Sequence, residues 1–149
     1  MPYPIGHVLF FMFCVFLAGV LVAAFRFLNT RERPGDAVYL MVLMMAGGLG
    51  SLFPDVPALW NYFLHGNLKH VTVGPVPTHS LFFGLFFFLI ALMTVYLVYR
   101  EWTKALSVGL FAAVGFISHL MLDDLAGGSI YYLYPFYSEP FSVFYQFFV

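Results

Sequence analysis

The residues with the clearest capacity for chemistry are a histidine and an aspartate, His119 and Asp123, which lie four positions apart. On a helix with 3.6 residues per turn, this spacing places both side chains on one face. They end an apolar run long enough to cross a membrane, where ionisable side chains are costly and therefore need a reason to be present. Imidazole and carboxylate groups suit Zn²⁺ and other divalent metals, so the pair indicates part of a metal site.

Two further polar groups stand at the ends of apolar runs: Asp55, which follows Phe-Pro, and His79, which lies between a threonine and a serine. We predict that Asp55 and His79 approach His119 and Asp123 from neighbouring helices and complete a divalent-metal site. A metal with three protein ligands and an open position lowers the pKa of a bound water to about 7. Asp124 points about 100° away from Asp123 on a helix, and we predict that it assists as a general base or by hydrogen bonding to a ligand.

Each of these residues also has an ordinary interpretation. A histidine at a helix end can be hydrogen-bonded at the membrane interface without binding a metal. Asp55 follows a proline and can end its helix in water, and Asp123 with Asp124 can form a solvated helix end. Acidic residues at a helix C-terminus are disfavoured by the helix dipole, however, which favours the site over the solvated end.

The composition determines which elements position these residues. Of the 149 residues, 62% are hydrophobic and only 9% are charged, whereas soluble domains carry roughly 25% charged residues. The chain is therefore predicted to be an integral membrane protein in contact with the lipid bilayer. A net charge of −1 without a basic stripe excludes a nucleic-acid-binding surface.

Hydropathy and helix-breaking residues predict a single all-α domain, residues 1–149, that crosses the membrane several times. About 20 apolar residues cross a bilayer, and four runs of this kind predict transmembrane helices at residues 6–28, 37–53, 79–99 and 105–123. Thr78 is the predicted N-cap of the third helix. Aromatic residues and prolines predict two interfacial segments, a short helix at residues 58–65 and a C-terminal tail at residues 130–149.

The basic residues predict the orientation of this bundle. Five of the six Lys and Arg residues lie at the end of the first predicted helix or in the connections between the first and second and between the third and fourth predicted helices. Such connections face the cytoplasm, so both termini are expected to be extracytoplasmic in the cell membrane. The ends of the helices that carry Asp55, His79, His119 and Asp123 then all fall on the extracytoplasmic side.

Three motifs, in this order and at these distances, resemble the signature of the YdjM-like family of membrane proteins. They are Gly-Ser-Leu-Phe-Pro-Asp at residues 50–55, Thr-His-Ser-Leu at residues 78–81 and His-Leu-Met-Leu-Asp at residues 119–123. The resemblance covers about residues 46–136. Members of this family are described as membrane-bound metal-dependent hydrolases, which implies metal-binding roles for Asp55, His79, His119 and Asp123.

The chain departs from the family pattern at two places. Pro57 stands where the family has a second acid, and Gly74-Pro75 stands where it commonly has a His-Arg pair. Three alternatives follow: His65 or His70 replaces a lost ligand, the site holds one metal ion instead of two, or the site is degenerate. The missing arginine also removes a clamp for a substrate phosphate.

The resemblance and the departures leave two functions open. The first is a metal-dependent hydrolase that acts on lipid or phosphoester substrates, with Zn²⁺ favoured over Mn²⁺, Mg²⁺ or iron. The second is a non-catalytic accessory subunit packed against other membrane subunits or further copies of the chain.

Overall fold

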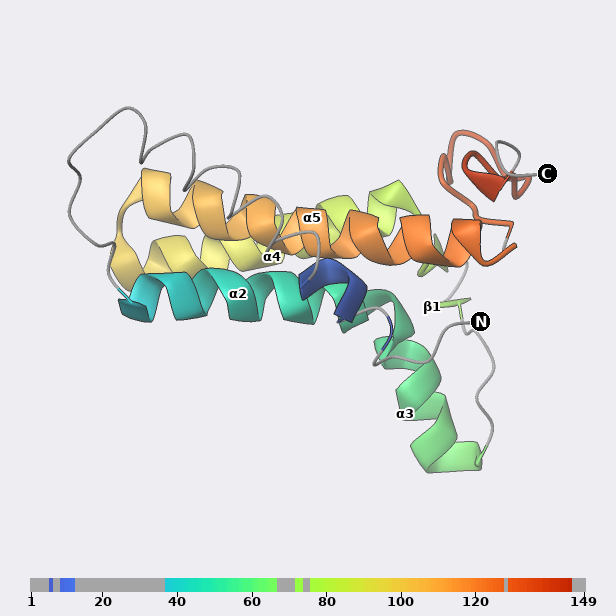
Figure 1. Ribbon diagram of the computed structural model, residues 1–149, viewed down its shortest axis with the longest axis horizontal. Helices are drawn as coiled ribbons and strands as arrows, with labels where there is room; N and C mark the ends of the chain where they lie inside the picture. The colour runs from blue at the N-terminus through green and yellow to red at the C-terminus, as the bar shows by residue number, and fades with distance from the viewer. Residues whose placement is uncertain are drawn as a thin grey trace.

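The computed structural model describes residue 6 and residues 9–12, 37–66, 72–73, 76–127 and 129–145. Three long helices within these ranges run side by side: α2 (Ala37–Leu52), α4 (Leu81–Tyr99) and α5 (Trp102–Leu125). Figure 1 shows that α2 and α5 run in one direction and that α4 returns in the opposite one. The three helices form an elongated bundle whose two ends carry different residues.

Close backbone contact between α2 and α5 explains the small residues in both helices. A β-carbon at Gly50 would collide with the carbonyl oxygen of Ala112, and one at Gly115 would collide with the carbonyl oxygen of Gly47. Helices in membranes use such small residues to bring their backbones together. The close α2–α5 interface therefore depends on Gly50, which begins the Gly-Ser-Leu-Phe-Pro-Asp motif, and on Gly115 of α5.

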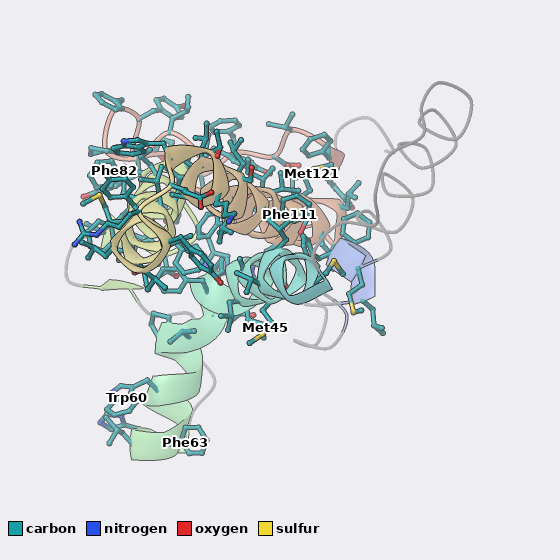
Figure 2. The ribbon with its side chains drawn as sticks, turned by 90° about the vertical axis from the view of Figure 1, so that its left-hand side faces the viewer. Met45, Trp60, Phe63, Phe82, Phe111 and Met121 are labelled. Atoms are coloured by element: carbon teal, nitrogen blue, oxygen red, sulfur yellow. The ribbon has the colours of Figure 1, made fainter. Side chains whose placement is uncertain are left out.

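A sharp bend follows α2. A short 3-10 helix, η1 (Phe53–Asp55), carries Pro54 at its start and joins α2 to α3 (Val56–His65). In Figure 1, α3 turns away from the axis of the bundle. Trp60 and Phe63 of α3 are 67% and 80% exposed, and Figure 2 shows their side chains well away from the three long helices. The predicted short helix at residues 58–65 is therefore present as part of α3, and its position in the membrane interface stays a prediction.

Two short strands, β1 (Thr72–Val73) and β2 (Val76–Pro77), pair antiparallel before α4 begins. Ser80 is the N-cap of α4, because its hydroxyl oxygen accepts a hydrogen bond from the Phe83 amide. The prediction that Thr78 caps this helix is therefore wrong by two residues. The cap leaves His79 in the turn just before α4, outside the regular helix.

Three helical runs among the described residues are long and apolar enough to cross a membrane: Val42–His65, Leu81–Tyr99 and Trp102–Leu125. The sequence predicted four, so the described part of the chain supports one fewer. Most of the missing prediction, at residues 6–28, lies outside the described residues. The predicted interfacial tail, described as far as residue 145, contains turns and an isolated bridge between Ile130 and Phe141 and no long helix.

Candidate metal centre

The four predicted ligands come from three elements that meet at one end of the bundle. Asp55 is the last residue of η1, His79 lies in the turn between β2 and α4, and His119 with Asp123 lies in the last two turns of α5. Figure 1 shows the end of α2, the start of α4 and the end of α5 at the same end of the molecule. α5 packs against both α2 and α4, and because α4 runs opposite to the other two helices, its start meets the ends of α2 and α5.

The side chains of these residues converge. The Nε2 atoms of His79 and His119 lie 3.1 Å apart, and Oδ2 of Asp123 lies 3.3 Å from each of them. Oδ1 of Asp55 lies 3.5 Å from Nε2 of His79 and 3.8 Å from Nε2 of His119. Ligand atoms of Asp55, His79 and His119 all lie within 4.8 Å of one another, as a group that could hold a metal ion requires. We call these four residues the His–Asp cluster.

The ring of His119 is oriented by the backbone of α2. Its Nδ1 lies 2.7 Å from the carbonyl oxygen of Ser51, and a carbonyl oxygen only accepts hydrogen bonds. Nδ1 therefore carries a proton, and Nε2 faces the other side chains of the cluster. Nδ1 of His79 lies 3.1 Å from the hydroxyl of Thr78. Partners of this kind fix the tautomer and orientation of metal-binding histidines.

Most side chains of the cluster are shielded from solvent, so their charges must be balanced by one another. The side chain of His119 is fully buried and that of Asp123 is 5% exposed, whereas His79 and Asp55 are 12% and 15% exposed. Burial alone would lower the pKa of His79, but its hydrogen bonds to Asp123 and Asp55 outweigh this effect and raise the pKa to about 9. The cluster therefore favours a positive charge at its centre.

The donor set fits a divalent cation. Two Nε2 atoms 3.1 Å apart cannot both present lone pairs or both present protons to each other without repulsion, so a shared proton or a cation must lie between them. With neutral imidazoles the two carboxylates give the cluster a charge of about −2, which a dication would balance in this buried setting. Among the described residues, Asp55, His79 and His119 alone meet the mutual spacing for one ion, and their two nitrogens and one oxygen are donor types that Zn²⁺ accepts; Asp123 contacts both histidines.

Asp124 lies on a different side of α5 from the His–Asp cluster and is fully buried. Its Oδ2 accepts hydrogen bonds from the Tyr132 hydroxyl at 2.8 Å and from the amides of Val143 and Phe144 at 2.8 and 3.0 Å. Its Oδ1 accepts a short hydrogen bond from the Ser142 hydroxyl. The structure therefore makes Asp124 the anchor of the C-terminal segment, while its predicted part in catalysis stays a prediction.

The C-terminal segment is attached to the cluster at a second point. The carbonyl oxygen of Tyr132 accepts a hydrogen bond from the amide of Leu81, two residues after His79. Tyr132 thus joins the start of α4 to the end of α5. Burial and the neighbouring carboxylate of Asp124 raise its pKa above the ordinary value of 10.0. The sequence suggested a membrane-belt aromatic at this position, and no spacing rule relates a tyrosine to an acid eight residues earlier.

The alternative histidines do not join the described cluster. His65 is an exposed residue at the end of α3, the helix that Figure 1 shows leaving the bundle. His70 lies outside the described residues. Pro57, at the position of the family's second acid, belongs to the first turn of α3.

Comparison with known proteins gives one family. A family model described as YdjM inner membrane protein matches residues 3–148, nearly the whole chain. Neither a curated protein nor a solved structure matches.

Proposed function

The chain belongs to the YdjM inner membrane protein family, and from this premise we propose that it is a membrane-embedded metal-dependent hydrolase. Asp55, His79, His119 and Asp123 would hold one divalent metal ion, with Zn²⁺ favoured by the two nitrogen donors. The observation that carries the proposal is the approach of both imidazole Nε2 atoms to one carboxylate oxygen, at 3.3 Å each.

A bound divalent cation would supply Lewis acidity toward an ester or phosphoester group. In the hydrolysis, the oxygen of a water forms a bond to the phosphorus or acyl carbon. The bond to the leaving oxygen breaks, and a proton passes from the water to that oxygen.

The chain's own residues would orient this reaction. The Ser51 carbonyl holds His119, and Thr78 contacts His79. Asp55 and His79 form the more exposed edge of the cluster, so a substrate would reach the site from their side. His119 and Asp123 form its buried floor.

The distribution of charge supports a site on the extracytoplasmic side. Arg100 and Lys104 lie at the junction of α4 and α5, at the opposite end of the bundle from the cluster (Figure 1). Basic residues at helix ends favour the cytoplasm. A membrane-impermeant maleimide should therefore label Glu139→Cys in intact spheroplasts and should leave Glu101→Cys unlabelled until the membrane is opened. The reverse pattern would place the cluster on the cytoplasmic side.

The metal is tested by elemental analysis of the purified chain in detergent. The wild-type protein should contain about one divalent metal ion per chain, and His119→Ala should lose most of it, because a ligand at the buried floor cannot be replaced by solvent. His65→Ala is the matched control, since it removes an exposed histidine outside the cluster. Metal-free wild-type protein that is folded and monodisperse would contradict the proposal.

Turnover is a separate test, because the cluster could hold a metal in a non-catalytic accessory subunit. The metal-loaded protein should release nitrophenol from p-nitrophenyl phosphate or p-nitrophenyl butyrate in mixed micelles. His119→Ala should lose this activity while keeping the elution volume of the wild-type protein. Bound metal without hydrolysis of either ester class would favour the accessory subunit.

A further inference from the structure

An apolar groove of about 300 Å³ runs along the bundle between α2 and α4, with α5 as its floor. Figure 2 looks along the bundle and shows α2 and α4 on either side below α5. Of the residues that line the groove, only Thr94 has a polar side chain. The walls include Met45 and Leu49 from α2 and Ile90 from α4, and the floor includes Ala112.

The groove leads toward the His–Asp cluster. Phe87 lies at its end nearest the cluster and stacks on Phe53, with ring centroids 4.0 Å apart. Phe53 begins the 3-10 turn that ends at Asp55. Leu49, on the opposite wall, lies two residues before Ser51, whose carbonyl orients His119. The apolar path and the polar cluster are therefore consecutive along the bundle.

The length of the groove corresponds to one leaflet of a bilayer. From Phe87 to Val95, both of which line it, eight residues at 1.5 Å each give about 12 Å. Half of the hydrocarbon core is about 15 Å. An acyl chain lying along the bundle would fill the groove, and its end next to the lipid headgroup would lie beside the His–Asp cluster.

The elements around the cluster place it at the level of lipid headgroups. Trp60 and Phe63 are exposed on α3, which Figure 1 shows crossing the direction of the bundle, as a helix in the interface would. Phe136, in the C-terminal segment at the same end, is 93% exposed. Tryptophan and tyrosine concentrate at the membrane–water interface, so the exposed Trp60 supports this level.

We propose that the groove binds one acyl chain of a membrane lipid and thereby presents the ester or phosphoester bonds of its head region to the His–Asp cluster. The binding of an acyl chain is argued from the groove alone, whereas the presentation of the lipid for hydrolysis rests on the proposed function. The substrate class would be a membrane lipid, and a water-soluble ester would still be hydrolysed, but more slowly, because it lacks the apolar anchor.

The test is photolabelling in vesicles that contain phosphatidylethanolamine with a diazirine on one acyl chain. Labelled residues, mapped by mass spectrometry, should concentrate at Met45, Leu49 and Ile90. Ala91→Phe places a ring in the volume that the acyl chain would occupy and should lower the labelling of Met45, Leu49 and Ile90 to that of residues outside the groove. Leu89→Phe, which adds a ring on the opposite face of α4, should leave it unchanged.

Two results would overturn the chain-binding groove. One is equal labelling of Leu89 and Val98, which are exposed on α4 and do not line the groove. The other is a dimer, detected by native mass spectrometry, together with chemical cross-links that place a second copy of the protein over Met45 and Ile90.

The same labelling with His119→Ala separates the two proposals. It should persist, because the groove does not include the cluster. Groove labelling in wild-type protein that contains no metal would support the groove and refute the metal centre. Metal binding without groove labelling would support the metal centre and refute the groove.

Discussion

Replacing Asp124 with asparagine should release the C-terminal segment from α5 while leaving the three long helices in place. Asp124 is fully buried, and its Oδ2 accepts three hydrogen bonds, from the Tyr132 hydroxyl and the amides of Val143 and Phe144. Asparagine has the same shape, but it is neutral and has a single acceptor oxygen. The change therefore weakens the three hydrogen bonds whose donors point at Oδ2 of residue 124.

The size of the effect follows from these bonds. A hydrogen bond to a charged group contributes about 1.5–3 kcal/mol and a neutral one about 0.5–1.5 kcal/mol, so three bonds lose roughly 3 kcal/mol. The neutral amide is cheaper to bury, which offsets part of this loss and leaves about 2 kcal/mol. Local opening of the segment should then become about thirtyfold more frequent.

Hydrogen exchange at the amides of Val143 and Phe144 measures this opening directly in nanodiscs. Their protection should fall about thirtyfold in Asp124→Asn, the factor that corresponds to about 2 kcal/mol. Glu139→Gln is the matched control, since it makes the same chemical change at an exposed acid in the same segment. If the two variants differed by less than about twofold, the contacts of Asp124 would not anchor the segment. Lost hydrolysis with unchanged protection would instead support the catalytic role predicted from the sequence.

Three further results are expected. The pKa of His79 is raised to about 9, so this ring must lose a proton before it binds a metal. The apparent Zn²⁺ affinity should therefore rise about tenfold per pH unit from pH 7 and level off above pH 9. A chelator competition assay would measure this. In the metal-free protein, charged His79 should stabilise the fold fully below about pH 6.5 and lose this contribution as the pH rises through 9, which thermal unfolding in detergent would report. Gly50→Ala should lower the melting temperature, because the β-carbon meets the Ala112 carbonyl, whereas Gly48→Ala, with nothing within 4 Å, should leave it unchanged or raise it.

The sequence predicted the convergence of the His–Asp cluster from general rules. Residues that end consecutive antiparallel helices meet at one end of a bundle, and the i, i+4 spacing of His119 and Asp123 gave their common face. The second predicted helix, residues 37–53, agrees with α2, which ends at Leu52 just before the 3-10 turn that contains Pro54. Family membership, expected from three short motifs, is confirmed over nearly the whole chain.

Other features of the site depend on contacts that no local pattern encodes. The hydrogen bond between the Ser51 carbonyl and His119 joins residues 68 positions apart and requires the close approach of α2 and α5. The bond from Leu81 to Tyr132 depends on a C-terminal segment that contains no regular helix. Composition described that segment only as aromatic and interfacial, because turns and single hydrogen bonds leave no periodic signal.

The adjacent acids Asp123 and Asp124 show how one helix end serves two purposes. Successive residues on a helix point about 100° apart, so Asp123 faces the two histidines while Asp124 faces the C-terminal segment. Because Tyr132 contacts both Asp124 and the amide of Leu81, the segment ties the end of α5 to the start of α4. The spacing between His79 and Asp123 therefore depends on a contact behind the cluster, and loosening that contact should weaken metal binding without removing a ligand.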